Sequence, residues 1–267
     1  MSQKYFYLHI PKTAGTTFND FLRKNFDASE CIFHIEIQID KIDNKTVLSG
    51  HIPLPKAQKI IPNFDDHVKL TVFREPLKQV SSHLRFVRKL AEPSEKKRLL
   101  EHTPQIQKIV ARLANTDLSS PQSLQEFIYW LKEENLALFH NTQTQYLVGT
   151  RFEMNAEIIQ DAKDRLETIT YIGITERLDD YIFLLSHKLG FLELQFKNKK
   201  LNVTEESFGL DTGNSEIEKV LEPLIYVDKI IYKEAKIKFE KEFAQLPSLK
   251  ANAIYSFFDR IRTRYKW

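Results

Sequence analysis

The segment Tyr5–Leu22, which reads YFYLHIPKTAGTTFNDFL, constrains the fold of this chain more than any other. A short apolar run is followed by the polar loop Pro11–Thr17, and then by an amphipathic segment that carries Phe18 and Phe21 on one side. This order predicts a strand, a tight loop and a helix. The first backbone N–H groups of such a helix lack intrahelical acceptors and face the loop, at the positive end of the helix dipole.

This loop is a candidate anion site. Lys12 adds a positive charge, and Thr16 and Thr17 add hydroxyl groups, beside the free N–H groups of the helix. A plain strand-to-helix turn capped by a threonine is the alternative that the residues leave open. The phosphate-loop pattern G-x-x-x-x-G-K-[ST] does not occur here, because the loop has the single glycine Gly15 and its lysine comes first.

A second unit of the same kind predicts the fold class. Val68–Phe73 is β-branched and apolar on both faces, as in the central strand of a parallel sheet. Pro76 then occupies the first turn of a predicted helix over Leu77–Leu90. Two such units imply right-handed crossovers, and therefore an α/β fold with an open, phosphate-loop-like parallel sheet flanked by helices.

The rest of the sequence predicts further strands, a helical insertion and a helical tail, all within a single domain over residues 1–267. Lys45–Ser49 and Thr170–Ile174 are further strand candidates, whereas Pro53 and Pro55 argue against a helix start between Gly50 and the next strand. A helical insertion is expected at about 92–149 and a helical tail at about 214–267. Expected helices and breaks in these parts are Pro121–Glu134 with Ser120 as cap, a helix from Asn155 to Glu167, a helix ending at Gly190, and breaks near Pro223 and Pro247.

Composition excludes several classes of protein. The chain has 267 residues, 42% of them hydrophobic and 28% charged, which is typical of a globular domain. A net charge of +3 gives no argument for nucleic acid. The single Cys31 fits a reducing compartment. No apolar run approaches the roughly 18 to 20 residues of a membrane span, and no signal peptide is recognised, so a soluble, cytoplasmic, bacterial protein is expected.

Arg74 and Ser82 form a second candidate anion site. Arg74 leaves the carboxyl end of its strand, the edge at which open α/β sheets bind ligands, and Ser82 follows eight residues later in the predicted helix. A guanidinium group and a hydroxyl group can hold a terminal phosphate through charge-assisted hydrogen bonds. An ion pair between Arg74 and Glu75 is the alternative explanation.

The order Pro-Lys-Thr-Ala-Gly-Thr-Thr directly after an N-terminal strand resembles the 5′-phosphosulfate loop of sulfotransferases that use 3′-phosphoadenosine 5′-phosphosulfate (PAPS). More narrowly, it resembles the branch of the heparan and chondroitin 2-O-sulfotransferases and their bacterial relatives. Arg-Glu-Pro with a serine at the eighth position resembles the family's 3′-phosphate site, although Glu75 stands where the family has Asp. The resemblance implies these cofactor-binding residues: Pro11, Lys12, Thr13, Ala14, Gly15, Thr16, Thr17, Arg74, Ser82 and Thr204.

The resemblance also implies a catalytic base. Gly50-His51 matches a Gly-His pair that supplies the base in the 2-O-sulfotransferase branch, and imidazole titrates near neutral pH. The other histidines show no metal-ligand spacing such as H-E-x-x-H, so no metal is expected. Lys12 is expected to act with His51 as the second catalytic residue.

Weaker signals come from four places. Asn141 and Gln143 resemble a substrate-cleft segment of bacterial relatives, with a polar helix end as the alternative, and Lys199, Lys200 and Thr204 lie where relatives close a loop over the cofactor. His83 is more readily interpreted as a surface helix residue than as a nucleotide contact. A solvated helix face is the favoured interpretation of a basic series, with attraction of an acidic glycan as the alternative: Arg85, Arg88, Lys89, Lys96, Lys97 and Arg98.

The function implied is transfer of the sulfuryl group of PAPS to an acceptor hydroxyl, expected on a glycan. Two rivals stay open. A kinase-like phosphotransferase needs Mg²⁺ and a G-K-[ST] loop, which the chain lacks. The second rival is a protein module that binds a nucleotide or a glycan without catalysing a reaction.

Overall fold

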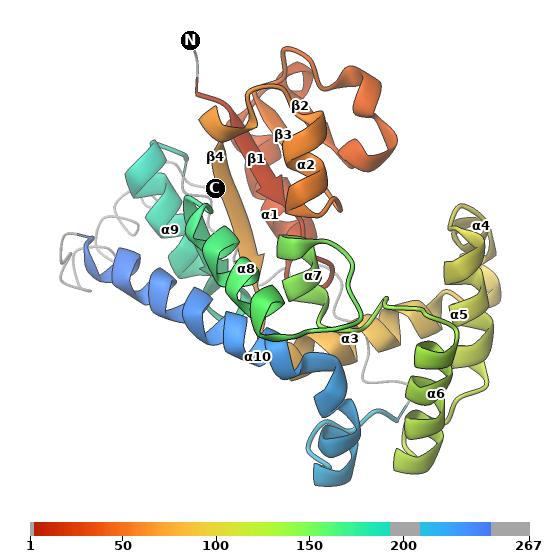
Figure 1. Cartoon of the computed structure of the whole chain (residues 1–267). Helices are drawn as coiled ribbons and strands as arrows, with labels where there is room; N and C mark the ends of the chain where they lie inside the picture. The colour runs from red at the N-terminus through yellow and green to blue at the C-terminus, as the bar shows by residue number, and fades with distance from the viewer. Residues whose placement is uncertain (1–2, 193–208, 247–267) are drawn as a thin grey trace, which may run out of the picture.

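The computed structural model describes residues 3–192 and 209–246, and its centre is a parallel sheet of five strands (Figure 1). The strand order is β2-β3-β1-β4-β5, and every described pair is parallel. This architecture confirms the predicted α/β class. The strands are β1 Tyr5–Leu8, β2 Cys31–Phe33, β3 Val47–Gly50, β4 Val68–Phe73 and β5 Tyr171–Ile174.

The sheet is covered on both faces. Side chains of a strand point alternately to the two faces, and every residue of β1 and β3 is buried. Strand β1 lies between β3 and β4, with Leu8 opposite Gly50 on one side and Thr71 on the other. The chain therefore reverses its winding direction at β1, and the carboxyl ends of these three strands are the edge at which such sheets bind ligands.

Helices fill the connections and form the insertion. Their bounds are α1 Gly15–Asn25, α2 Leu54–Ile60, α3 Pro76–Lys89, α4 Lys96–Leu100, α5 Pro104–Ala114, α6 Pro121–Glu133, α7 Thr142–Val148, α8 Ala156–Glu167, α9 Leu178–Leu189 and α10 Ser215–Ala244. The predicted N-caps are confirmed, because Ser120 accepts a hydrogen bond from Ser123 N and Asn155 accepts one from Ile158 N. The helical insertion at about 92–149 is confirmed as α4 to α7.

Two sequence expectations about elements are wrong, and one strand was missed. Pro55 does not prevent helix α2, because it lies in the first turn, where its missing N–H needs no acceptor. Pro223 does not break α10, although the start of α10 runs at an angle to the rest in Figure 1, as a proline ring displaces the preceding carbonyl. Strand β2 was not predicted, since Cys31–Phe33 is too short to show a period. Pro247 lies outside the described residues.

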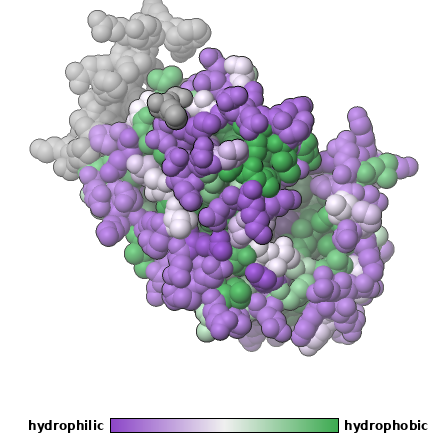
Figure 2. Space-filling model, turned by 45° about the horizontal axis from the view of Figure 1, so that its top comes forward, coloured by the Kyte–Doolittle hydropathy of each residue, from purple (hydrophilic) through white to green (hydrophobic). Residues whose placement is uncertain are grey.

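Two hydrophobic clusters hold these elements together. One lies around the sheet, with α1, α8 and α9, and the other joins α3, α5 and α6. Helix α10 contributes Leu221 and Ile225 to the second cluster and Ile231 and Phe239 to the first, so it connects the sheet to the insertion. Figure 2 shows a mostly hydrophilic face, with hydrophobic side chains gathered around a hollow. Within the described part of the chain, no helix has both the length and the apolar character to cross a membrane.

A buried carboxylate joins α10 to α7, and its loss is expected to destabilise the protein. Asp228 is almost completely buried and accepts hydrogen bonds from the backbone N–H of Gln143 and Thr144 and from the Thr144 hydroxyl. Asp228→Ala leaves those three donors unpaired in the interior, so the free energy of unfolding should fall by about 2–4 kcal/mol. Urea denaturation measures this change. The exposed-residue control Asp40→Ala should shift it by less than about 0.5 kcal/mol, and equal effects would contradict the role of Asp228.

Candidate functional site

The loop between β1 and α1 has a backbone shaped for binding. Lys12 and Ala14 both adopt left-handed conformations, with φ of 66° and 69°. Thr13 is buried, and its hydroxyl donates to Ile10 O at 2.9 Å, so this side chain fixes the loop from inside. The first helical hydrogen bond runs from Phe18 N to Ala14 O, and α1 has no side-chain cap. The N–H groups of the first turn, beside exposed Thr16, are thus available to an anion.

Gly15 is required where α1 meets β1. A Cβ atom at this position would lie 1.8 Å from His9 Nε2, inside any permitted contact. His9 is buried, its Nδ1 lies 3.5 Å from the Asn19 amide, and Ser49 Oγ donates to that amide at 2.8 Å. Burial and the nearby His51 and His34 hold the pKa of His9 well below its ordinary value. His9 is therefore a neutral packing residue under the loop.

Lys12 lies among other cations. Its Nζ is 4.5 Å from the centre of the Phe86 ring of α3, and the Arg98 guanidinium of α4 is 4.9 Å from the same ring. Burial, with the charges of Arg74 and Arg98, lowers the pKa of Lys12 to about 8. A concentration of positive charge of this kind attracts an anionic ligand. Arg98 therefore lies next to Lys12 in the candidate site, and the interpretation of the basic series as a solvated helix face does not hold for this residue.

Arg74 supports the loop from the end of β4. Its Nη1 donates to Lys12 O at 3.0 Å. The Gln143 side chain fixes the Arg74 backbone, since its Oε1 accepts from Arg74 N at 2.8 Å and its Nε2 donates to Arg74 O at 2.9 Å. Gln143 and Asn141 are fully buried, and Asn141 Oδ1 accepts from Val227 N and Asp228 N. Both side-chain amides therefore make hydrogen bonds inside the protein. This favours their interpretation as a polar helix end over the interpretation as a segment that contacts the substrate.

Helix α3 packs along the loop. Gln79 Nε2 donates to Pro11 O at 2.9 Å, and Ser82 is 8% exposed. His83 is buried, so the interpretation of it as a surface residue is wrong; burial, Lys12 and His51 lower its pKa to about 3. Gln79 Oε1 and His83 Nδ1 are buried without a hydrogen-bond partner. Gln79 therefore has a free hydrogen-bonding atom next to the Pro11–Thr17 loop that a polar ligand could use.

Two members of the basic series have structural partners. Arg85 Nη2 donates to Leu210 O at 2.6 Å, and Arg88 Nη1 donates to the carbonyls of Leu113 and Thr116. Both guanidinium groups bond to backbone oxygens between α3 and its neighbours. Arg88 thus ties α3 to the insertion, and Arg85 ties α3 to the segment before α10.

His51 follows β3 and has the tautomer of a base. Its Nδ1 lies 2.8 Å from His9 O, and because a carbonyl oxygen only accepts, Nδ1 carries the hydrogen. The lone pair is then on Nε2. Burial lowers the pKa of His51, and the Glu36 carboxylate opposes that change in part. A neutral imidazole with an unprotonated Nε2 at neutral pH suits proton abstraction.

Glu36 and His34 complete a cluster that sequence reasoning did not find. Glu36 Oε2 accepts from His51 N at 3.0 Å, and Glu36 Oε1 lies 3.1 Å from His34 Nδ1. Gly50 makes room for this carboxylate, because a Cβ there would lie 2.5 Å from Glu36 Oε2. The hydrogen bond to Glu36 raises the pKa of His34. Each of β1, β3 and β2 is followed directly by a histidine, which is a signal for this cluster once β2 is known.

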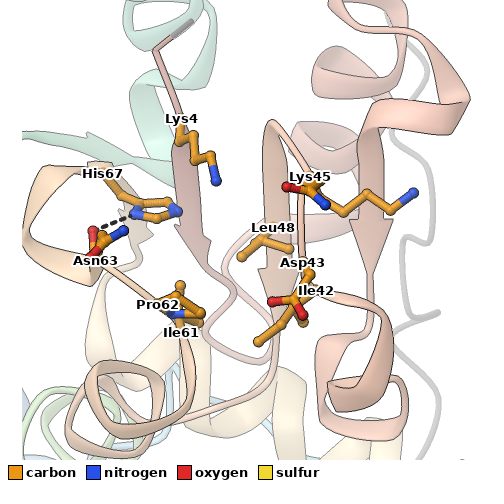
Figure 3. A pocket seen from close by; sticks show the side chains of 10 residues that line it. Lys4, Ile42, Asp43, Lys45, Leu48, Ile61, Pro62, Asn63 and His67 are labelled. Atoms are coloured by element: carbon orange, nitrogen blue, oxygen red, sulfur yellow. Dashed lines mark hydrogen bonds between the residues drawn. The ribbon is translucent and has the colours of Figure 1, made fainter. Parts of the chain in front are cut away.

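The described residues also enclose a cavity at the opposite edge of the sheet. It has a volume of about 330 Å³ and lies beside the amino ends of β1, β3 and β4 (Figure 3). Lys4, Lys45 and His67 line it, and His67 Nδ1 donates to Asn63 O at 3.0 Å. Because the Pro11–Thr17 loop follows the carboxyl end of β1, this cavity is separate from the candidate site. Thr204, Lys199 and Lys200 lie outside the described residues.

No protein-family model matches the chain, and no curated protein matches it.

Proposed function

We propose that this protein is a sulfotransferase that moves the sulfuryl group of PAPS to an acceptor hydroxyl. The observation that carries the proposal is that three adjacent strands end together, β3 at His51, β1 at the Lys12 loop and β4 at Arg74. His51, the Pro11–Thr17 loop and Arg74 thus lie at one edge of one sheet. The resemblance of the loop, of Gly50-His51 and of Arg-Glu-Pro to the family of 2-O-sulfotransferases assigns these groups their chemistry.

The proposed reaction is an in-line displacement at sulfur. The acceptor oxygen forms a bond to sulfur while the bond from sulfur to the bridging oxygen of the 5′-phosphate breaks. His51 Nε2 takes the proton of the acceptor hydroxyl, and adenosine 3′,5′-bisphosphate leaves. Lys12 stabilises the negative charge that develops on the bridging oxygen. Loop N–H groups, Thr16 and Thr17 hold the 5′-phosphate, so positioning and electrostatics supply most of the catalysis.

The acceptor is proposed to be a glycan hydroxyl. Arg98, beside Lys12 on the Phe86 ring, is a half-exposed cation that an acidic sugar can approach. Its ion pair with Glu95 is long, at 3.7 Å, and it therefore remains open to exchange for an anionic ligand.

The first test is the binding of adenosine 3′,5′-bisphosphate, measured by calorimetry without added metal. We expect saturable binding, and binding of adenosine 5′-monophosphate that is about 10- to 100-fold weaker, since a charge-assisted hydrogen bond is worth about 1.5–3 kcal/mol. Arg74→Ala and Ser82→Ala should each reduce this preference. Because Arg74 also bonds to Lys12 O, the monophosphate is the control: an equal loss for both ligands means that Arg74 only supports the loop.

The same experiment separates the rivals. Failure to bind the bisphosphate, together with Mg²⁺-dependent binding of ATP, would overturn the proposal in favour of a kinase-like phosphotransferase. Tight binding of the bisphosphate without transfer to any of a broad panel of acceptors would favour a binding module.

A further inference from the structure

We infer that His34, Glu36 and His51 form a site for a zinc-type divalent cation. One donor atom from each of the three side chains lies within 4.8 Å of the other two. Two imidazole groups and one carboxylate are a ligand set that zinc and similar transition metals accept. The site itself is independent of the proposed reaction.

The distances need only a small adjustment to hold an ion. Zinc binds imidazole nitrogen and carboxylate oxygen at about 2.0–2.2 Å, so two ligands of a tetrahedral ion lie about 3.3–3.5 Å apart. Glu36 Oε1 and His34 Nδ1 are 3.1 Å apart, already near that separation. Rotation of the exposed His34 ring and of the partly buried Glu36 can bring both toward His51.

The surroundings of His51 match those of a metal ligand. A ligating histidine commonly donates its second ring N–H to a backbone carbonyl, which fixes the tautomer and the ring orientation. His51 Nδ1 makes this bond to His9 O at 2.8 Å, and Nε2 is the nitrogen left for a metal. His9 itself is excluded from the ligand set, because its Nδ1 faces Asn19 and its Nε2 packs against Gly15.

The local backbone explains how three residues from two strand ends converge. His34 has a left-handed conformation, with φ of 62°, and this turns the chain after β2 into the short 3₁₀ helix Ile35–Ile37. The turn brings Glu36 back over the end of β3, where Gly50 leaves space for its carboxylate. Three protein ligands then leave one coordination position open for water.

A metal on this site has one consequence for the proposed function. It occupies His51 Nε2, the lone pair that the proposed sulfuryl transfer uses to accept a proton. Zinc should therefore inhibit transfer, and this part of the inference rests on the proposed function.

The test is zinc binding by tag-free, chelator-treated protein, followed by calorimetry and by competition with a chromophoric chelator. We expect one ion per chain at micromolar affinity or tighter, and at least about 10-fold weaker binding for His34→Ala and for Glu36→Ala. His187→Ala, a change of an exposed histidine on α9, and Cys31→Ser, which removes the thiol of β2, should bind as the wild type does. Co²⁺ should give the intense visible absorption of a tetrahedral site in the wild type and lose it in His34→Ala.

Absence of saturable zinc binding would overturn the inference, as would equal affinity in wild type, His34→Ala and Glu36→Ala. Circular dichroism of each variant excludes unfolding as the cause of a loss. Zinc binding that depends on His34, without PAPS-dependent transfer, would support the metal site and count against the proposed function alone. Transfer that zinc at saturating concentration leaves unchanged would overturn the inhibitory consequence.

Discussion

His51→Ala is expected to lower the rate of sulfuryl transfer by at least about 10²-fold while leaving the affinity for adenosine 3′,5′-bisphosphate unchanged. A positioned general base contributes about 10²–10⁴-fold, and His51 is oriented for that role by the bond from its Nδ1 to His9 O. It is not among the residues expected to hold the nucleotide. Measuring kcat for transfer and the calorimetric affinity on the same preparation separates loss of chemistry from loss of the fold.

The pH dependence gives this prediction a second readout. A base acts in its neutral form, and burial lowers the pKa of His51, so kcat/KM of the wild type should be flat from neutral pH upward through the range in which Lys12 stays charged. It should fall at acidic pH, as His51 becomes protonated, and again above about pH 8, where Lys12 loses its charge. The acidic limb should disappear in His51→Ala. The control His187→Ala changes an exposed histidine and should retain both rate and profile. Near-wild-type turnover of His51→Ala would remove His51 from the mechanism.

Much of the fold could be predicted because its central elements carry strong local signals. Val68–Phe73 matches strand β4 residue for residue, and the predicted helix over Leu77–Leu90 matches α3 to within one residue at each end. A buried parallel strand is apolar throughout, and a proline fixes the start of the helix after it. Strand β2 has no such signal, because three residues at the edge of the sheet obtain their structure from pairing with β3.

The candidate site also contains residues that could be predicted from the sequence and residues that could not. Lys12, His51 and Arg74 could be assigned to one edge from sequence, since each follows a recognisable parallel strand. The positions of Arg98 and His83 could not be predicted, because they depend on how α3 and the insertion pack against the loop. The position of Glu36 depends on the left-handed backbone conformation of His34, which no residue pattern in the sequence predicts. The family resemblance is the source of the proposed roles of Lys12, His51 and Arg74. The residues that surround them depend on tertiary packing, which the sequence pattern does not show.

Lys12→Ala is expected to lower kcat by at least about 10²-fold, because it removes the charge that stabilises the leaving oxygen in the transition state. Lys12→Arg keeps a charge, but its planar guanidinium must fit over the Phe86 ring near the charges of Arg74 and Arg98, so partial activity is expected. Lys78→Ala removes an exposed lysine from the first turn of α3 and is the matched control. Turnover of Lys12→Ala within about 3-fold of the control would exclude Lys12 as the charge stabiliser.

The pKa of Lys12, about 8, predicts how the wild type should respond to pH in the same experiments. Below that value the ammonium group is charged and attracts the phosphates, and above it the neutral amine does not. Affinity for adenosine 3′,5′-bisphosphate should therefore weaken as the pH rises from 7 to about 9.5. Lys12→Arg, which stays charged over this range, should show a flatter dependence in calorimetry. If the affinity depends on pH equally in the wild type and in Lys12→Arg, a group other than Lys12 causes the pH dependence of binding.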